Sequence, residues 1–136
     1  MAAISKTTSC ISEKILQYPC NKNLTKSLYE QIAMQIKSMI MNGELRTDSL
    51  LPSVRELSKL TNVSILTIRA AYDTLKYDGF IETFPGRGSF VMALDKDFVR
   101  KEQLRRAEQL LQQVADIGRI YGIPLDTLVE MLKNLA

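Results

Sequence analysis

The sequence contains no histidine and only two cysteines among its 136 residues. Without histidine, the chain lacks the usual general base and the commonest metal ligand. Cys10 and Cys20 do not make a zinc site by themselves, and they either form a bridge or, as in most cytosolic proteins, stay reduced. The sequence also has no glycine-rich loop of the kind that cradles phosphates. We therefore expect neither an enzyme nor a bound cofactor or metal.

Long hydrophobic runs are also missing. No apolar run approaches the roughly 18 residues that a membrane-spanning helix needs. Residues 1–14 lack the apolar run of about 7–15 residues that a signal peptide carries. The hydrophobic share of 46% is nevertheless high enough for a packed core. These features predict a soluble cytoplasmic protein with no membrane partner, and the length suits either one domain or a small domain with an appendage.

An excess of positive charge is confined to one end of the chain. The net charge of +3 arises within residues 1–26. Residues 27–92 carry equal numbers of acidic and basic side chains, and so do residues 93–136. A basic patch or stripe is the usual footprint of a nucleic-acid-binding domain. If this chain binds DNA, it must do so through the placement of a few residues.

Three helices are predicted from their start signals and apolar spacing. Ser27 and Ser53 are each followed three residues later by a glutamate, which is the pattern of a capping box, and Ser64 caps a third helix. Gly43 ends the first helix and Gly79 ends the third. The buried faces that the spacing predicts are Leu28, Ile32, Ile36, Met39 and Ile40 in the first helix, Val54, Leu57 and Leu60 in the second, and Ile68, Ala71, Tyr72 and Leu75 in the third.

A short β-hairpin is expected after the third helix. Residues 80–84 and 89–91 are rich in aromatic and β-branched residues, which favours two strands. Residues 85–88 form the tip, with Arg87 between two glycines. By contrast, residues 44–51, which precede the second helix, are expected to form a loop.

The remainder of the chain is expected to form two helices. Apolar residues recur at spacings of three and four from Leu104 to Tyr121 and again from Leu125 to Leu135. Pro124 is well placed in the first turn of the last helix. Two helices alone cannot bury both apolar stripes, so either a second copy of the chain or the chain's own N-terminal helices must cover them.

The predicted order of helix, helix, turn, helix and hairpin is that of a winged helix-turn-helix. The expected fold is mainly α with a small β-wing, followed by a two-helix C-terminal hairpin. The expected regions are an arm of residues 1–24, a DNA-binding domain of residues 25–93 and a helical region of residues 94–136. In such a domain the second helix of the pair enters the major groove of double-stranded DNA. The alternative is an adaptor that binds another protein through the same fold.

Residues 25–92 also contain a dense set of short motifs. They are Leu28-Tyr29-Glu30-Gln31-Ile32, Gly43-Glu44-Leu45, Leu51-Pro52-Ser53-Val54-Arg55-Glu56-Leu57, Val63-Ser64, Thr67-Ile68-Arg69, Ala71-Tyr72, Leu75, Gly79 and Gly86-Arg87-Gly88-Ser89-Phe90-Val91. These motifs resemble those of the GntR-type bacterial transcription regulators. The resemblance implies sequence-specific binding to operator DNA.

The resemblance implies roles only for the residues that match the family's motifs. Arg55 would contact DNA near the start of the second helix, although a surface salt bridge is the alternative. Ser64 and Thr67 would donate to phosphates, and Arg69 would contact a base edge or a phosphate. Arg87 at the wing tip would reach either a narrow minor groove or a phosphate. The expected DNA-binding residues are Ser53, Arg55, Ser64, Leu66, Thr67, Arg69, Gly86, Arg87 and Gly88.

This chain departs from the family pattern at two positions of the recognition helix. The family often has arginine where this chain has Ile65 and Ala70, which puts the family's usual base contacts in doubt. Leu66 and Ala70 lie on the outward face, where they could pack on thymine methyl groups. The alternative is that Leu66 is a scattered surface apolar residue of a common kind.

The region after the wing resembles the short YtrA-like branch of the family, in which two C-terminal helices serve dimerisation. That resemblance implies a homodimer, which suits the reading of two operator half-sites. It further implies repression of a nearby operon, with transporter operons as typical targets. A small-molecule effector is a further expected partner, of no defined identity.

Overall fold

The computed structural model describes Ile11 and residues 26–136. Apart from Ile11, the expected arm of residues 1–24 lies outside the described residues, and so do Cys10 and Cys20. The chain divides into two compact units between Leu94 and Asp95.

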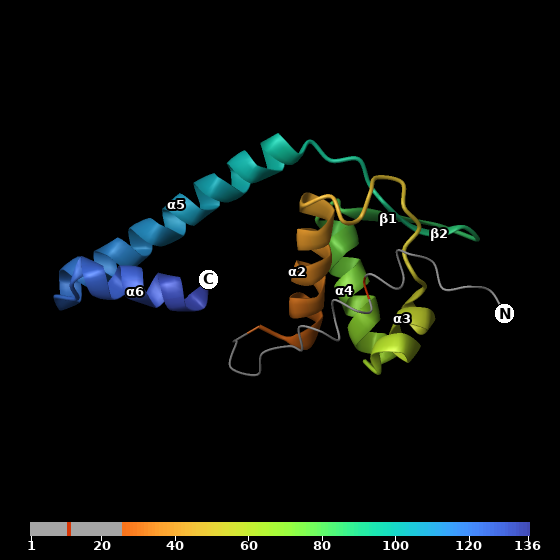
Figure 1. Ribbon diagram of the computed structural model, residues 1–136, viewed down its shortest axis with the longest axis horizontal. Coiled ribbons are helices and arrows are strands. Elements are labelled where there is room, and N and C mark those ends of the chain that lie inside the picture. The colour runs from red at the N-terminus through yellow and green to blue at the C-terminus, as the bar shows by residue number, and fades with distance from the viewer. Residues whose placement is uncertain (1–10, 12–25) are drawn as a thin grey trace. The chain divides into compact units, whose positions relative to one another are not determined.

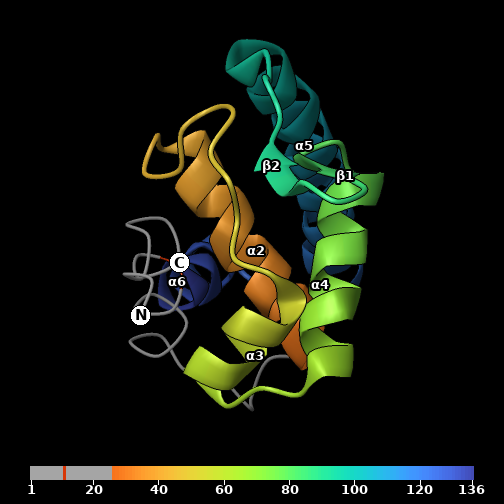
Figure 2. The same ribbon diagram turned by 90° about the vertical axis from the view of Figure 1, so that its right-hand side faces the viewer.

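Between residues 26 and 94, the first unit contains the helices α2 (Leu28–Met41), α3 (Val54–Thr61) and α4 (Ile65–Tyr77). Helix α4 contacts both of the others, and α3 is turned across the start of α4 (Figure 2). The predicted inward face of α4 is confirmed, because its four residues are all buried. The largest fully buried side chains of this unit between residues 26 and 94 are Ile32, Ile36, Ile40, Leu57, Ile68, Leu75 and Val91.

Two of the three expected serine caps form. The Ser53 hydroxyl accepts a hydrogen bond from the backbone N–H of Glu56 at 3.1 Å, and the Ser64 hydroxyl accepts one from Thr67 at 3.2 Å. Ser27 is the N-cap residue of α2, but the predicted capping bond was wrong, because the Ser27 side chain makes no such bond. There the Gln31 side chain instead donates to the Lys26 carbonyl at 2.9 Å. Sequence spacing therefore located the cap position but not the orientation of the Ser27 hydroxyl.

The wing is an antiparallel pair, β1 (Ile81–Phe84) and β2 (Gly88–Val91), which pairs Ile81 with Val91 and Phe84 with Gly88. It begins where α4 ends (Figure 1), and β1 contacts α4. The segment expected to be a simple loop pairs with β2 through a bridge between Leu50 and Phe90. Three further backbone bonds of 2.8–3.0 Å join Asp48, Ser49 and Leu51 to β2. Because this pairing joins distant parts of the chain, local sequence patterns did not reveal it.

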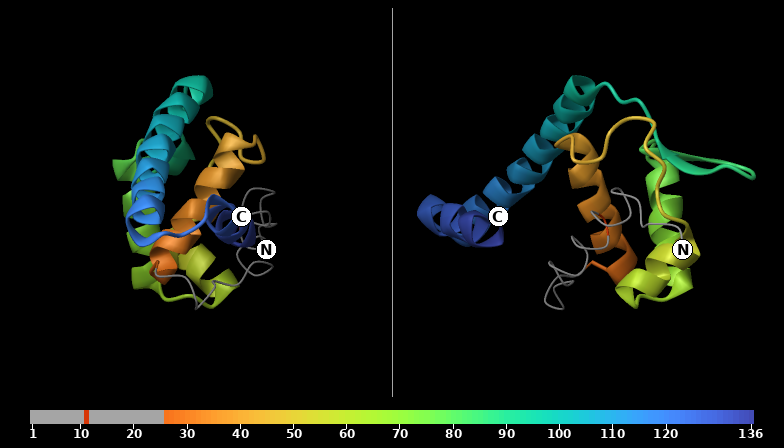
Figure 3. Two further views of the ribbon diagram at one scale, coloured as in Figure 1. Left: turned by 90° about the vertical axis from the view of Figure 1, so that its left-hand side faces the viewer. Right: turned by 45° about the vertical axis from the view of Figure 1, so that its right-hand side comes forward.

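The second unit consists of α5 (Lys96–Tyr121) and α6 (Leu125–Leu135). The chain reverses between them at Gly122, whose φ of +66° is left-handed (Figure 3). Gly118 is the one buried residue of these two described helices. A Cβ atom there would lie 2.9 Å from Leu128 Cδ1 and 3.3 Å from the Ile123 carbonyl. A glycine at this position therefore allows α6 to pack closely on α5.

In the described part of the chain, no helix has the length and apolar character needed to cross a bilayer.

Candidate nucleic-acid interface

The turn between α3 and α4 is held by side chains of α3. The Ser58 hydroxyl donates to the Val63 carbonyl at 2.5 Å, and the Thr61 hydroxyl donates to the Leu57 carbonyl at 2.6 Å. Asn62 adopts a left-handed φ of +56°, a conformation that asparagine tolerates better than most residues. The Ser58 bond ties α3 to the residue before the cap of α4, and the Thr61 bond lies within α3.

A buried tyrosine links α4 to the start of α3. The Tyr72 hydroxyl donates to the carbonyl of Pro52 at 2.6 Å. Burial, and secondly the charge of Glu56, raise the pKa of the Tyr72 phenol well above its usual range. The phenol therefore stays protonated and remains a donor. The sequence predicted Tyr72 as a core residue but not this bond, although a buried tyrosine hydroxyl usually finds a partner.

The first residues of α4 present two hydroxyl groups near the helix N-terminus. Ser64 is exposed and Thr67 is half-buried, and their hydroxyl oxygens lie 2.8 Å apart. A helix N-terminus attracts anions because of its unpaired N–H groups and its dipole. The arrangement suits a phosphate group at the start of α4.

The outward face of α4 is mainly apolar near its start. Leu66 is 74% exposed, and Arg69 beside it is exposed as well. Farther along the same face Asp73 pairs with Lys76 at 3.5 Å. Within residues 26–136, neither Arg55 nor Arg69 takes part in an ion pair, so both guanidinium groups are available to a ligand.

The wing tip is a tight turn that ends in an exposed arginine. The Arg87 N–H donates to the Phe84 carbonyl at 2.9 Å, and Gly86 has a φ of +75°, as the third residue of a type II turn requires. Gly88 has a φ of +107°, and a Cβ atom there would lie 2.9 Å from Leu50 Cδ1. Gly86 therefore shapes the turn, and Gly88 lets the Leu50 side chain lie close to the start of β2.

A groove of about 490 Å³ runs between the start of α3 and the wing. It brings together four of the expected site residues, Ser53, Gly86, Arg87 and Gly88. The other five lie on α3 and on α4 or its cap, outside the lining of this groove. Sequence analysis missed Leu50 and Thr83, which also line it, because only the strand pairing places them there.

The three-helix core, the short turn before α4 and the pairing of the hairpin define a winged helix-turn-helix protein. A family model described as "Bacterial regulatory proteins, gntR family" matches residues 28–91. The chain is 30% identical over 109 residues to the "HTH-type transcriptional repressor YtrA" of Bacillus subtilis (strain 168), which covers 80% of this chain and 84% of that protein. The chain therefore belongs to the GntR family of bacterial regulatory proteins.

Solved structures agree with this assignment. A GntR family transcriptional regulator from Listeria monocytogenes has a TM-score of 0.57 and 28% identity, over 81% of this chain and 96% of that one. YtrA from Sulfolobus acidocaldarius, a GntR-family transcription factor, has a TM-score of 0.53 and 32% identity. The match covers 65% of this chain and 94% of that one. The predicted fold, mainly α with a small β-wing, is confirmed. The chain is a DNA-binding transcription regulator, and these relatives are described as regulators rather than as enzymes or adaptors.

Proposed function

We propose that the chain binds operator DNA as a homodimer and represses transcription. The observation that carries the DNA-binding part is the geometry of α4, whose N-terminal cap, exposed Arg69 and outward Leu66 lie within its first two turns. The N-terminal residues of a recognition helix contact base edges in the major groove. Repression is proposed because the matched relative from Bacillus subtilis is described as a repressor.

Each expected DNA-binding residue has a role in this proposal. Ser64 and Thr67 contact phosphates, Arg69 reads a base edge or holds a phosphate, and Leu66 faces the bases. Ser53 and Arg55 hold the DNA backbone near the start of α3. Gly86, Arg87 and Gly88 bring the wing close to the duplex, because glycine backbone can approach it without a Cβ atom in the way. We assign these contacts to residues 25–93 and dimerisation to residues 94–136.

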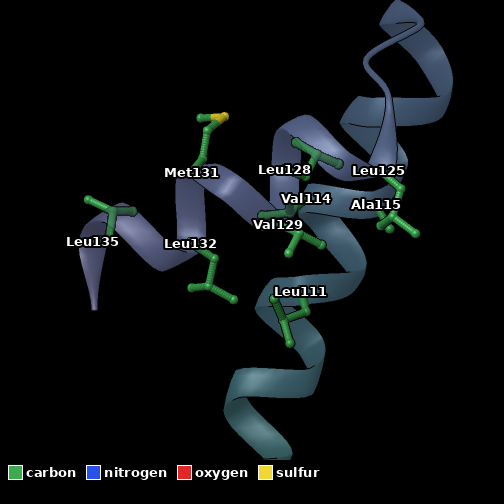
Figure 4. A pocket seen from close by; sticks show the side chains of 9 residues that line it. All are labelled: Leu111, Val114, Ala115, Leu125, Leu128, Val129, Met131, Leu132 and Leu135. Carbon is green, nitrogen blue, oxygen red and sulfur yellow. The ribbon is translucent and has the colours of Figure 1, made fainter.

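The dimerisation part rests on the apolar groove of the α5–α6 hairpin. Its volume is about 370 Å³, and Figure 4 shows Val114 of α5 beside Val129 of α6. All nine side chains that line the groove are apolar, and most are more than a third exposed in the single chain. A twofold partner would cover this surface with the same surface of its own. The lining residues are Leu111, Val114, Ala115, Leu125, Leu128, Val129, Met131, Leu132 and Leu135.

The third partner in this proposal, besides operator DNA and a second copy of the chain, is a small-molecule effector. It would bind at the interface between the two subunits. Small-molecule sites usually enclose most of the ligand, and the groove of one hairpin is open on one side. The second subunit would provide the missing wall.

The test of DNA binding starts from operator sites selected from genomic fragments by the full chain. Arg69→Ala is expected to weaken binding to such a site by about 1–3 kcal/mol, measured by fluorescence anisotropy at fixed salt. The matched control is Arg100→Ala, which removes the same charge from α5. Wild-type affinity for Arg69→Ala would show that α4 is not the recognition helix.

The wing contact is tested with two operators that differ only in A·T content at the wing position. If Arg87 enters a narrow minor groove, Arg87→Ala should lose more affinity on the A·T-rich operator. An equal loss on both, with the salt slope reduced by about one, would assign Arg87 to a phosphate. Unchanged binding on both would remove the wing from the interface.

A further inference from the structure

The start of α4 carries apolar side chains where a DNA-reading helix would be expected to carry polar ones. Leu66 is 74% exposed, and Ile65 beside it is also exposed. Ala70 lies one helical turn after Leu66 and is half-buried. Over the first two turns of α4, Arg69 is the one exposed ionisable side chain. The helix therefore offers few groups that can hydrogen-bond to bases.

The two hydroxyl groups at the start of α4 are linked by one hydrogen bond, which leaves one hydroxyl hydrogen for a phosphate. Ser64 accepts from the Thr67 N–H, and the Ser64 and Thr67 hydroxyls bond to each other. These bonds hold both groups at the helix end, which is where a phosphate would bind. Leu66 is thus the largest exposed side chain between this phosphate-binding end and Arg69.

The outward face also limits how far α4 can approach the bases. Asp73 is exposed and lies on the same face less than one turn beyond Ala70. Its carboxylate pairs with Lys76 at 3.5 Å, and DNA phosphates would repel it. The contact with bases therefore ends before Asp73, which leaves Leu66, Arg69 and Ala70 to face the groove.

We propose that Leu66 specifies a thymine in each operator half-site by packing on its C5-methyl group, with Ala70 one turn beyond it lining the same contact. The thymine methyl is the one apolar group that the four base pairs present in the major groove. A leucine cannot hydrogen-bond to any other base edge, so it favours thymine by the burial of apolar surface. This inference rests on the proposed function, because it assumes that α4 lies in the major groove.

The test replaces each thymine of a selected half-site in turn with deoxyuridine, which removes the methyl group and keeps the base pair. The full wild-type chain should lose about three- to fivefold in affinity at one or two positions, the factor that follows from exposing one methyl group to water. Leu66→Ala should bind the thymine and deoxyuridine operators equally well. Because Leu66 is exposed, the Leu66→Ala variant should have the same thermal unfolding temperature as the wild type.

The matched control is Tyr77→Ala, which removes a side chain that is 92% exposed from the far end of the same face. This variant should retain the full difference between thymine and deoxyuridine. The inference is overturned if the wild type binds its site tightly but responds to no deoxyuridine, or if Leu66→Ala keeps the response. Failure of the wild type to bind any DNA would instead overturn the proposed function.

Discussion

The winged unit (residues 26–94) buries many of its large apolar side chains, whereas the hairpin unit (residues 95–136) leaves most of its own exposed. In the winged unit, Ile32, Ile36 and Ile68 are completely buried, where α4 packs against both α2 and α3. In the hairpin, Leu104 is 62% exposed and Ile120 is 73% exposed, since two helices can cover each other only along one strip at Gly118. The winged unit thus buries its own core, whereas the hairpin by itself leaves most of its large apolar side chains exposed.

The largest expected effect tests whether the winged unit is complete. Ile68→Ala should lower its free energy of unfolding by about 2–5 kcal/mol, because the change leaves a cavity in a closed core. Urea unfolding followed by circular dichroism measures the loss. Leu66→Ala on the same helix is the control and should stay within about 0.5 kcal/mol. Similar losses for the two variants would contradict the burial pattern of α4.

A charge placed in the apolar groove of the α5–α6 hairpin tests whether that groove is the interface between two copies of the chain. Leu132→Asp should weaken self-association by about 100-fold or more, because an unpaired carboxylate would be buried between the subunits. Sedimentation velocity across a concentration series measures this. Asn134→Asp adds the same charge at a polar position of α6 and should leave association unchanged. If Leu132→Asp associates as the wild type does, the groove is not the interface.

The bond between α4 and the start of α3 tests how much one polar contact adds to the winged unit. Tyr72→Phe leaves the buried Pro52 carbonyl without its donor and should cost about 1–3 kcal/mol at neutral pH. The folded state raises the pKa of Tyr72 above its ordinary value of 10.0, so its stabilisation is complete below about pH 10 and is lost as the pH rises further.

The pH dependence tests whether the Tyr72 phenol is buried in its protonated form. The difference in unfolding free energy between wild type and Tyr72→Phe should be constant from pH 7 to about pH 9 and shrink above about pH 10. Urea titrations at several pH values measure it. A difference that grows with pH would show that the folded state does not raise the pKa of Tyr72.

The smallest effect compares two serines that look alike in the sequence. Ser53→Ala should cost about 1 kcal/mol, because it removes the cap of α3. Ser27→Ala should change the stability little, because that side chain makes no capping bond. Thermal unfolding of both variants measures these two losses of stability. Equal losses would mean that Ser27 caps α2 in solution.

Much of the winged unit could be predicted from the sequence because its signals are local. Apolar spacing located α2, α3 and α4 to within a few residues, and Pro85, Gly86 and Gly88 marked the wing tip. The same spacing marked the two helices of the hairpin. The expected site residues could be assigned to elements for the same reason, although their contacts with DNA remain predictions.

What the sequence could not determine depends on segments far apart in the chain. The pairing of Leu50 with Phe90 and the bond from Tyr72 to Pro52 join residues 40 and 20 positions apart, and no local pattern encodes such a pairing. The groove that unites Ser53 with Arg87 follows from both contacts. The sequence by itself determined which segments are helical and which face of each is apolar, because backbone periodicity is local. Only the tertiary structure decided which of those faces are closed within one chain, because burial depends on what packs against them.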